Sequence, residues 1–247
     1  MMRMAVLAVA LLLLCPGAGL ADMKVPMTRP MVQKQAPVKP GMQQAAKDPM
    51  LAAQRWLKSI GYDLSFEQMK TLKRLVLQKY SLETTPLITN ANMKHVRVLS
   101  GLEIIQIPRQ INDTGIKYLE GLSNLRVVNM PVCGVTDVGL GYVAKLPRMD
   151  NLVASGCNIT DVGVQKIAGR SFDVLNLTGT HITDQAIEYL KGHGINKLFL
   201  SQTAITDACV DTLISFQPSR LDIQFTQITP AGHQRLKAAL PNAKIVY

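Results

Sequence analysis

The sequence predicts an α/β solenoid in which short parallel strands line a concave face and helices line a convex face. Three observations predict it: a recurring triplet, a strand pattern ahead of most triplets and a helix pattern behind them. The triplets start with an apolar residue, usually followed by Thr and a polar residue, and recur every 23 or 24 residues, at Ile88, Ile111, Val135, Ile159, Ile182, Ile205 and Ile228. A unit of this size cannot bury its apolar side alone, so neighbouring units must stack.

The strand pattern is L-x-x-L-x-L-x-x-T/C, and it begins ten residues before the triplet. Leu125, Val128, Met130 and Cys133 fill it ahead of Val135. Together with the triplets, this pattern resembles the leucine-rich-repeat family, specifically the short bacterial and F-box-associated type that carries ITDxGLxxL. The resemblance covers residues 88–247 and implies a right-handed leucine-rich-repeat solenoid.

Two units depart from the pattern. In the first full repeat Gln110 reaches Ile111 one residue early, which predicts a tighter turn there. The unit at Ile88 shows helix positions but no strand pattern ahead of it, so we expect it to serve as a cap.

The helix pattern places apolar residues five and eight positions after each triplet start. This spacing turns one helix face toward the core. The pairs are Ile116 and Leu119, Leu140 and Val143, Val164 and Ile167, Ile187 and Leu190, and Val210 and Leu213. The fourth position is small in the six units from Ile111 onward, which predicts a close approach of backbone there; it holds Gly115, Gly139, Gly163, Ala186, Cys209 and Gly232.

Four segments are expected along the chain of 247 residues. Residues 1–21 have the three regions of a secretory signal peptide, with Arg3, an apolar run and small residues before Asp22. Residues 22–47 are a basic Pro- and Gln-rich linker, 48–86 an N-terminal helical cap and 87–247 the repeat domain. We therefore expect an exported protein, periplasmic or secreted, with no transmembrane segment in its mature chain. A lipid anchor at Cys15 is disfavoured because Leu14 precedes it.

Two helices are expected in the cap. Asp48 and Pro49 form a helix start, and Gly61 ends the first helix. The second helix begins with a capping box at Ser65 and Gln68. Its apolar face is expected to comprise Phe66, Met69, Leu72, Leu75 and Val76.

The net charge of +10 is concentrated near the N-terminus. Residues 22–95 hold 12 Lys and Arg against 5 Asp and Glu, whereas residues 96–247 hold 14 against 12. The repeats therefore lack the basic face that nucleic-acid binding requires. Residues 22–95 could contact an anionic surface electrostatically, and a solvated tail without a partner is the alternative.

The Asp that follows Thr in the triplets is expected to be structural. The last triplet has Pro230 where the others have Asp, and Pro favours the first helical position. Thr is then the helix cap, and Asp184 and its equivalents meet the positive end of the helix dipole. The alternative is a calcium ladder of Asp137, Asp161, Asp184 and Asp207.

No catalytic, metal or cofactor site is expected, so the chain is predicted to be non-enzymatic. Cys209 and Asp211 resemble the Cys-x-Asp motif of bacterial leucine-rich-repeat ubiquitin ligases, but the separate catalytic domain of those enzymes is missing here. Cys133 and Cys157 hold equivalent positions in adjacent repeats and could form a disulfide or remain buried thiols. The histidines, His95, His181, His193 and His233, lack metal-ligand spacing.

The exposed side chains of the strands are the expected functional surface. An apolar stripe flanked by amides is typical of a protein-binding site, whereas strand propensity is the alternative explanation of the valines. The predicted partner-binding residues are Val127, Asn129, Asn151, Val153, Val174, Asn176, Lys197, Phe199, Arg220 and Asp222. The partner is expected to be a protein, with no nucleic acid.

A second function remains open from the sequence. The chain could be a structural subunit of an envelope or membrane-associated complex that docks through its N-terminal helices. The mitochondrial ATP-synthase coupling-factor family, which also places helices before a few such repeats, is a distant precedent. Sequons at Asn112, Asn158 and Asn176 would matter only in a eukaryotic secretory pathway.

Overall fold

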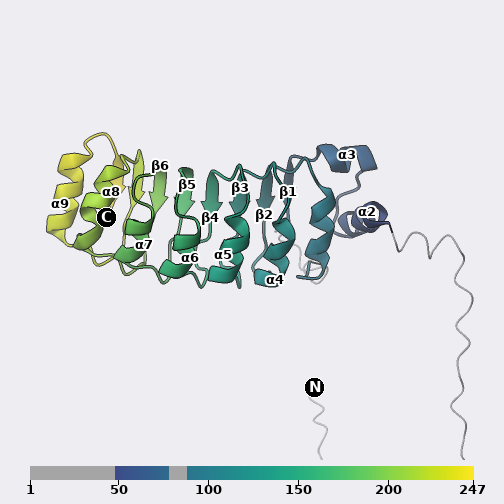
Figure 1. Cartoon of the computed structure of the whole chain (residues 1–247), viewed down its shortest axis with the longest axis horizontal. Coiled ribbons are helices and arrows are strands. Elements are labelled where there is room, and N and C mark those ends of the chain that lie inside the picture. The colour runs from purple at the N-terminus through teal and green to yellow at the C-terminus, as the bar shows by residue number, and fades with distance from the viewer. Residues whose placement is uncertain (1–47, 78–87) are drawn as a thin grey trace, which may run out of the picture. The chain divides into compact units, whose positions relative to one another are not determined.

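The computed structural model describes residues 48–77 and 88–247. The expected signal peptide and linker, residues 1–47, lie outside the described residues. The described strands form one parallel sheet in strict chain order (Figure 1). They are β1 (Arg74–Val76), β2 (Ile104–Gln106), β3 (Val127–Asn129), β4 (Asn151–Val153), β5 (Phe172–Asn176), β6 (Ile195–Phe199), β7 (Arg220–Asp222) and β8 (Lys244–Val246).

Helices follow the strands and stack beside one another on one face of this sheet (Figure 1). The repeat helices are the 3-10 helices η2 (Asn92–Val98), η3 (Lys117–Leu119) and η4 (Asp207–Cys209) and the α-helices α4 (Asp113–Ile116), α5 (Asp137–Val143), α6 (Asp161–Lys166), α7 (Asp184–Tyr189), α8 (Val210–Ser215) and α9 (Pro230–Ala239). Ahead of them lie α2 (Pro49–Ser59) and α3 (Phe66–Thr71). The predicted α/β leucine-rich-repeat solenoid is confirmed.

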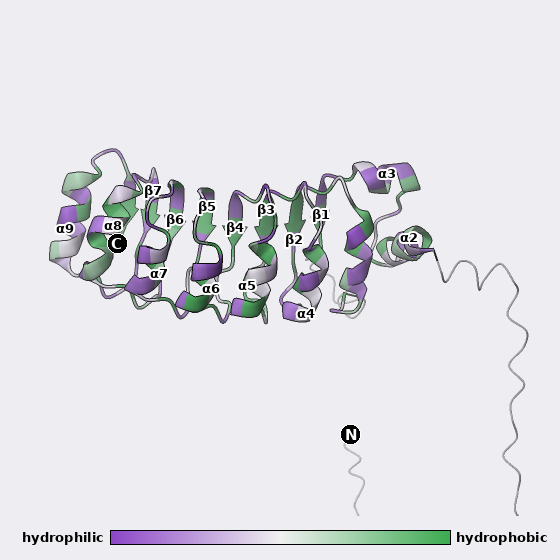
Figure 2. Cartoon of the chain, viewed as in Figure 1, coloured by the Kyte–Doolittle hydropathy of each residue, from purple (hydrophilic) through white to green (hydrophobic). Residues whose placement is uncertain are grey.

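The core lies between the sheet and the helices, and its side chains form rows that run from strand to strand. Leu152 pairs in register with Leu175 of the next strand, and Leu198 pairs with Leu221. All four are fully buried, as are the helix residues predicted to point inward. Colouring by hydropathy shows that the strands and helices carry both apolar and polar residues (Figure 2). Each repeat therefore completes the core of its neighbours.

A ladder of Asp and Thr residues joins successive repeats at the start of each helix. The Asp161 carboxylate accepts hydrogen bonds from the backbone N–H of Thr183 at 2.8 Å and from its hydroxyl at 2.7 Å. The same pair of bonds joins Asp113 to Thr136, Asp137 to Thr160, Asp184 to Thr206 and Asp207 to Thr229. These Asp residues are structural, as predicted, but each also holds the next repeat in place.

The ladder also explains the small residue at the fourth position, and it corrects the expected cause. A Cβ built on Gly163 would lie 2.2 Å from Oδ1 of Asp137, and one built on Gly232 would lie 2.1 Å from Oδ1 of Asp207. The close neighbour is the preceding repeat's carboxylate rather than passing backbone. Ala186 shows that a methyl group is accommodated in one repeat without loss of the Asp161 bonds.

The second cap helix is shorter than the sequence predicted. The capping box of Ser65 and Gln68 is present, but α3 ends at Thr71 and Leu72 is already extended. Leu75 belongs to strand β1, where it is fully buried, and pairs in register with Ile105. The expected helix through Val76 is therefore wrong, because these residues alternate between buried and exposed sides as in a strand.

Tyr62 satisfies the outer edge of β1. Its hydroxyl donates a hydrogen bond to the carbonyl of Val76 at 3.0 Å and accepts one from the N–H of Val76 at 3.1 Å. These are the backbone groups of β1 that point away from β2. Trp56 on α2 and Leu57 are buried against the same core, so the cap and the repeats share one hydrophobic interior.

Candidate functional site

The face of the sheet opposite the helices carries two rows of outward-pointing side chains. We call this surface the sheet face. All ten predicted partner-binding residues lie on it, each half-buried. The first row runs through Arg74, Ile104, Val127, Asn151, Val174, Lys197, Arg220 and Lys244. The second runs through Val76, Gln106, Asn129, Val153, Asn176, Phe199, Asp222 and Val246.

The valines do not form the continuous stripe that the sequence suggested. Asn151 separates Val127 from Val174 in the first row, and Asn176 separates Val153 from Phe199 in the second. Apolar and polar side chains therefore alternate in both directions across β3 to β6, and the polar ones are amides except for Lys197. Diagonal neighbours on a sheet lie about 7–8 Å apart, so the apolar groups meet only across diagonals. Such a pattern offers hydrogen-bonding groups and apolar contacts at every step.

Phe199 has the predicted orientation, and Arg220 lies over its ring. Leu198 and Leu200 on either side are fully buried, so the register inferred from the sequence is confirmed. The guanidinium carbon of Arg220 is 5.1 Å from the centre of the Phe199 ring, which is cation–π geometry. Phe199 is thus held as a fixed aromatic surface rather than a free side chain.

Two polar atoms on the sheet face lack a hydrogen-bond partner among the described residues. They are Oδ1 of Asn129 and Nε of Arg220, and both atoms are buried from solvent. A buried polar group without a partner is costly, so both atoms add strain to this part of the sheet face. Asn176 differs, since its Oδ1 accepts the backbone N–H of Thr178 at 3.0 Å.

A row of left-handed residues borders the sheet face where the strands end, and the sequence did not reveal it. Gly156 and Gly179 hold this turn position in two repeats. Val132, Gln202 and Phe225 hold it in three further repeats, with φ of 53°, 58° and 55°. The Phe225 side chain is 79% exposed. A large or β-branched residue in this conformation is strained, and its only sequence signal is alignment with glycines of other repeats.

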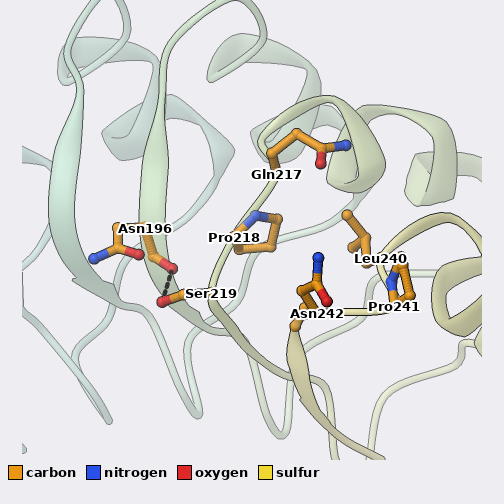
Figure 3. A pocket seen from close by; sticks show the side chains of 8 residues that line it. Asn196, Gln217, Pro218, Ser219, Leu240, Pro241 and Asn242 are labelled. Carbon is orange, nitrogen blue, oxygen red and sulfur yellow. Dashed lines mark hydrogen bonds between the residues drawn. The ribbon is translucent and has the colours of Figure 1, made fainter.

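A pocket of about 250 Å³ lies at the other edge of the sheet, where β6 and β7 begin. Figure 3 shows it between Asn196, Ser219 and Asn242, with Pro218 and Pro241 among its walls. The Ser219 hydroxyl donates to the backbone carbonyl of Asn196 at 3.2 Å, and no histidine or carboxylate lines the pocket. The lining therefore provides no base that could activate Ser219.

The three cysteines in the described part of the chain, Cys133, Cys157 and Cys209, are free thiols and buried. Cys133 donates to the carbonyl of Pro108 at 3.4 Å, and Cys157 donates to that of Met130 at 3.2 Å. Burial, and then a hydrogen bond with Asp184, raise the pKa of Cys209, so this thiol is a poor nucleophile. Among residues 48–77 and 88–247, no group of three or more His, Cys, Asp or Glu side chains could hold a metal ion.

The comparisons with known proteins agree with this architecture. Residues 155–168 match the family model described as a Leucine Rich repeat. The internalin inlF of Listeria monocytogenes superposes with a TM-score of 0.52 at 17% identity, over 72% of this chain and 48% of that protein. The internalin inlC2 of the same species superposes with a TM-score of 0.51 at 16% identity, over 81% of this chain and 92% of that one. No curated protein sequence matches the chain.

The sheet, the stacked helices and these matches define the class: the protein has a leucine-rich-repeat solenoid fold. At these identities the internalins show the fold alone, and the chain spans about half the length of inlF. In the part of the chain that the structure describes, no helix is long and apolar enough to cross a membrane.

Proposed function

We propose that the protein is a non-enzymatic binding module that holds a protein partner on its sheet face. The observation that carries this proposal is the alternation of apolar and polar side chains over β3 to β6, the polar ones being amides except for Lys197, with Phe199 at its end. A protein partner needs both apolar contact and hydrogen bonds, and this surface supplies them in alternation.

Site-specific photo-crosslinking tests the proposal. A photoreactive phenylalanine analogue replaces Val153 on the sheet face in one variant and Val162 on the helix face in the other. Val162 is 58% exposed, so it is a matched accessible control. We expect the photoreactive residue at position 153 to yield a discrete protein adduct in cells and the one at position 162 to yield none. Equal adducts from both positions would contradict a sheet-face site.

Docking through the N-terminal helices is the second candidate function. A pocket of about 340 Å³ between α2 and η2 favours it, with Ala52, Lys94, His95 and Arg97 among its lining residues. In this case the chain is a structural subunit of an envelope or membrane-associated complex. The same photoreactive residue in place of Ala52 would then give the adduct, and position 153 would give none.

We further propose that the protein is exported, to the periplasm or the medium, through residues 1–21. The support is in the sequence, where Arg3, an apolar run and small residues precede Asp22. Amino-terminal sequencing of the protein from the extracytoplasmic fraction should begin at or near Asp22. Recovery of a chain that still begins at Met1 from the cytosol would overturn this proposal.

A further inference from the structure

Three cations from three successive strands lie in line on the sheet face. Lys197 of β6 pairs in register with Arg220 of β7, and Arg220 pairs with Lys244 of β8. Adjacent strands are about 4.8 Å apart, so these residues form one contiguous row. We call Lys197, Arg220 and Lys244 the basic row. The first-row positions of β2 to β5 are uncharged, so this concentration of charge is local.

None of the three side chains forms an ion pair with any described residue. The seven ion pairs within residues 48–77 and 88–247 involve other cations. Asp222 is the acidic residue of the neighbouring row, but it already accepts hydrogen bonds from the Ser201 hydroxyl and from the backbone N–H of Gln224. Three like charges at this spacing repel one another, and an anionic partner would relieve that repulsion.

Apolar surface adjoins the basic row. Val174 pairs in register with Lys197 and extends the same row toward β5. The Phe199 ring lies beneath the guanidinium of Arg220, whose Nε has no partner among the described residues. An occupant of this surface therefore meets positive charge and apolar contact side by side.

We propose that the basic row, with Val174 and Phe199, binds an extended acidic segment of a partner protein. The inference rests on the proposed sheet-face function and names the chemistry of the partner. Carboxylates would pair with Lys197, Lys244 and the Arg220 guanidinium, while an apolar side chain would contact Phe199. The protein's own residues 22–47 do not fit, because they hold five Lys and Arg against one Asp.

A protein segment fits this surface better than a nucleic acid or a lipid surface. Polyphosphates are bound by extended basic faces, whereas here the charge is confined to three strands. Asp222 would also lie beside the phosphates, and Val174 and Phe199 would be left without apolar contact. A peptide can present carboxylates and an apolar side chain alternately, which matches both components of the surface.

Fluorescence anisotropy with a defined peptide tests the inference. The probe is a fluorescein-labelled peptide of alternating Glu and Ser with one central Leu, and its control is the same peptide with Gln in place of Glu. We expect the Glu peptide to bind the full-length protein at least about tenfold more tightly than the Gln peptide, and to weaken as salt rises. Equal binding of both peptides would overturn the inference.

Matched lysine variants localise the effect. Lys197→Gln combined with Lys244→Gln should weaken the Glu peptide about tenfold. Lys117→Gln combined with Lys237→Gln removes the same charge from helix-side residues that are exposed and have no ion pair among the described residues, and should leave affinity within about twofold. Equal losses in both double variants would show non-specific attraction and sink the proposal. Arg220 is kept in both because it packs on Phe199.

Two further measurements separate the remaining outcomes. Anionic phospholipid vesicles or a single-stranded oligonucleotide could bind more tightly than the Glu peptide. If the Lys197 and Lys244 double variant also loses that binding, the surface binds phosphate and the proposal is refuted. If the peptide fails while the adduct at position 153 persists, the partner is not acidic but the sheet-face function stands. If both fail, the sheet-face function fails as well.

Discussion

The carboxylate of Asp184 accepts two hydrogen bonds from Thr206 of the following repeat, one from the backbone N–H and one from the hydroxyl, both at 2.7 Å. Asp184 is also the first residue of α7, so one side chain meets the positive end of its own helix and fixes the start of the next. Thr206 in turn accepts the backbone N–H of Ala208 at 3.2 Å. The helix starts of successive repeats are thereby linked into one hydrogen-bonded chain.

Replacing Asp184 should destabilise the protein more than a helix-dipole contact alone would. Hydrogen bonds to a charged group are worth about 1.5–3 kcal/mol, so we expect Asp184→Ala to lower the free energy of unfolding by about 2 kcal/mol in urea denaturation. Asp211→Ala is the control, since its carboxylate is 81% exposed and only pairs with Arg235. It should change stability by less than about 1 kcal/mol. Equal effects would contradict the ladder.

Acid should remove the contribution of Asp207. The hydroxyl and the backbone N–H of Thr229 donate to its carboxylate and hold the pKa of Asp207 below its ordinary value. Because the folded pKa is lower than the unfolded one, the stabilisation is complete above the unfolded value of about 3.9 and is lost as pH falls through the folded pKa. The stability difference between wild type and Asp207→Asn should therefore be constant at neutral pH and shrink below about pH 4. A difference that does not shrink at all as the pH falls below about 4 would refute this assignment.

Relieving the left-handed turn at Val132 should stabilise the fold. A left-handed conformation costs a non-glycine residue about 1–2 kcal/mol, whereas glycine adds about 0.5–1 kcal/mol of unfolded-state entropy. Val132→Gly should raise the free energy of unfolding by roughly 0.5–1 kcal/mol by this balance. Gly156→Val at the equivalent position, where φ is 66°, should lower it. Changes of the same sign in the two variants would exclude backbone strain as the cause.

Phe199 and Leu198 should separate binding from stability. Phe199→Ala removes a half-buried ring from the sheet face, so we expect a thermal midpoint close to that of wild type and at least about tenfold weaker binding of the Glu peptide. Leu198→Ala leaves a cavity in the core and should cost about 2–5 kcal/mol. If a partner binds Phe199→Ala as tightly as it binds wild type, the binding surface lies away from β6.

The three described thiols should be inert in the folded protein. Cys133, Cys157 and Cys209 are buried, and burial raises the pKa of Cys209. Treatment with iodoacetamide near pH 8, followed by mass spectrometry, should leave all three unmodified in the native state and modify all three in denaturant. Native labelling of Cys209 would contradict the structural role of this residue.

The sequence predicts the repeats well because their signals are local and repeated. The residues five and eight positions after the triplet start are buried as expected, and the strand register around Leu198 is confirmed. β1 was missed although Leu72, Leu75 and Leu77 follow the strand pattern. In this unit the pattern begins at Leu72, which lies 16 residues before the triplet at Ile88 instead of ten. That irregular spacing concealed the match.

Features that arise between repeats were less predictable. The Asp184 bonds to Thr206 join residues 22 positions apart, and helix-start chemistry alone gave an equally good account of the Asp. The alternation of valine and asparagine on the sheet face depends on which residues pair across strands. Lys197 and Arg220 were among the predicted partner-binding residues, but Lys244 was missed because it lies in the terminal strand, whose match to the repeat is partial.

The Tyr62 hydroxyl has a further consequence for how the molecule associates. By occupying both the donor and the acceptor that Val76 presents at the outer side of β1, it removes one of the attachment points that another strand would need there. A second copy of the chain could pair with Val76 at this edge only by displacing the Tyr62 phenol.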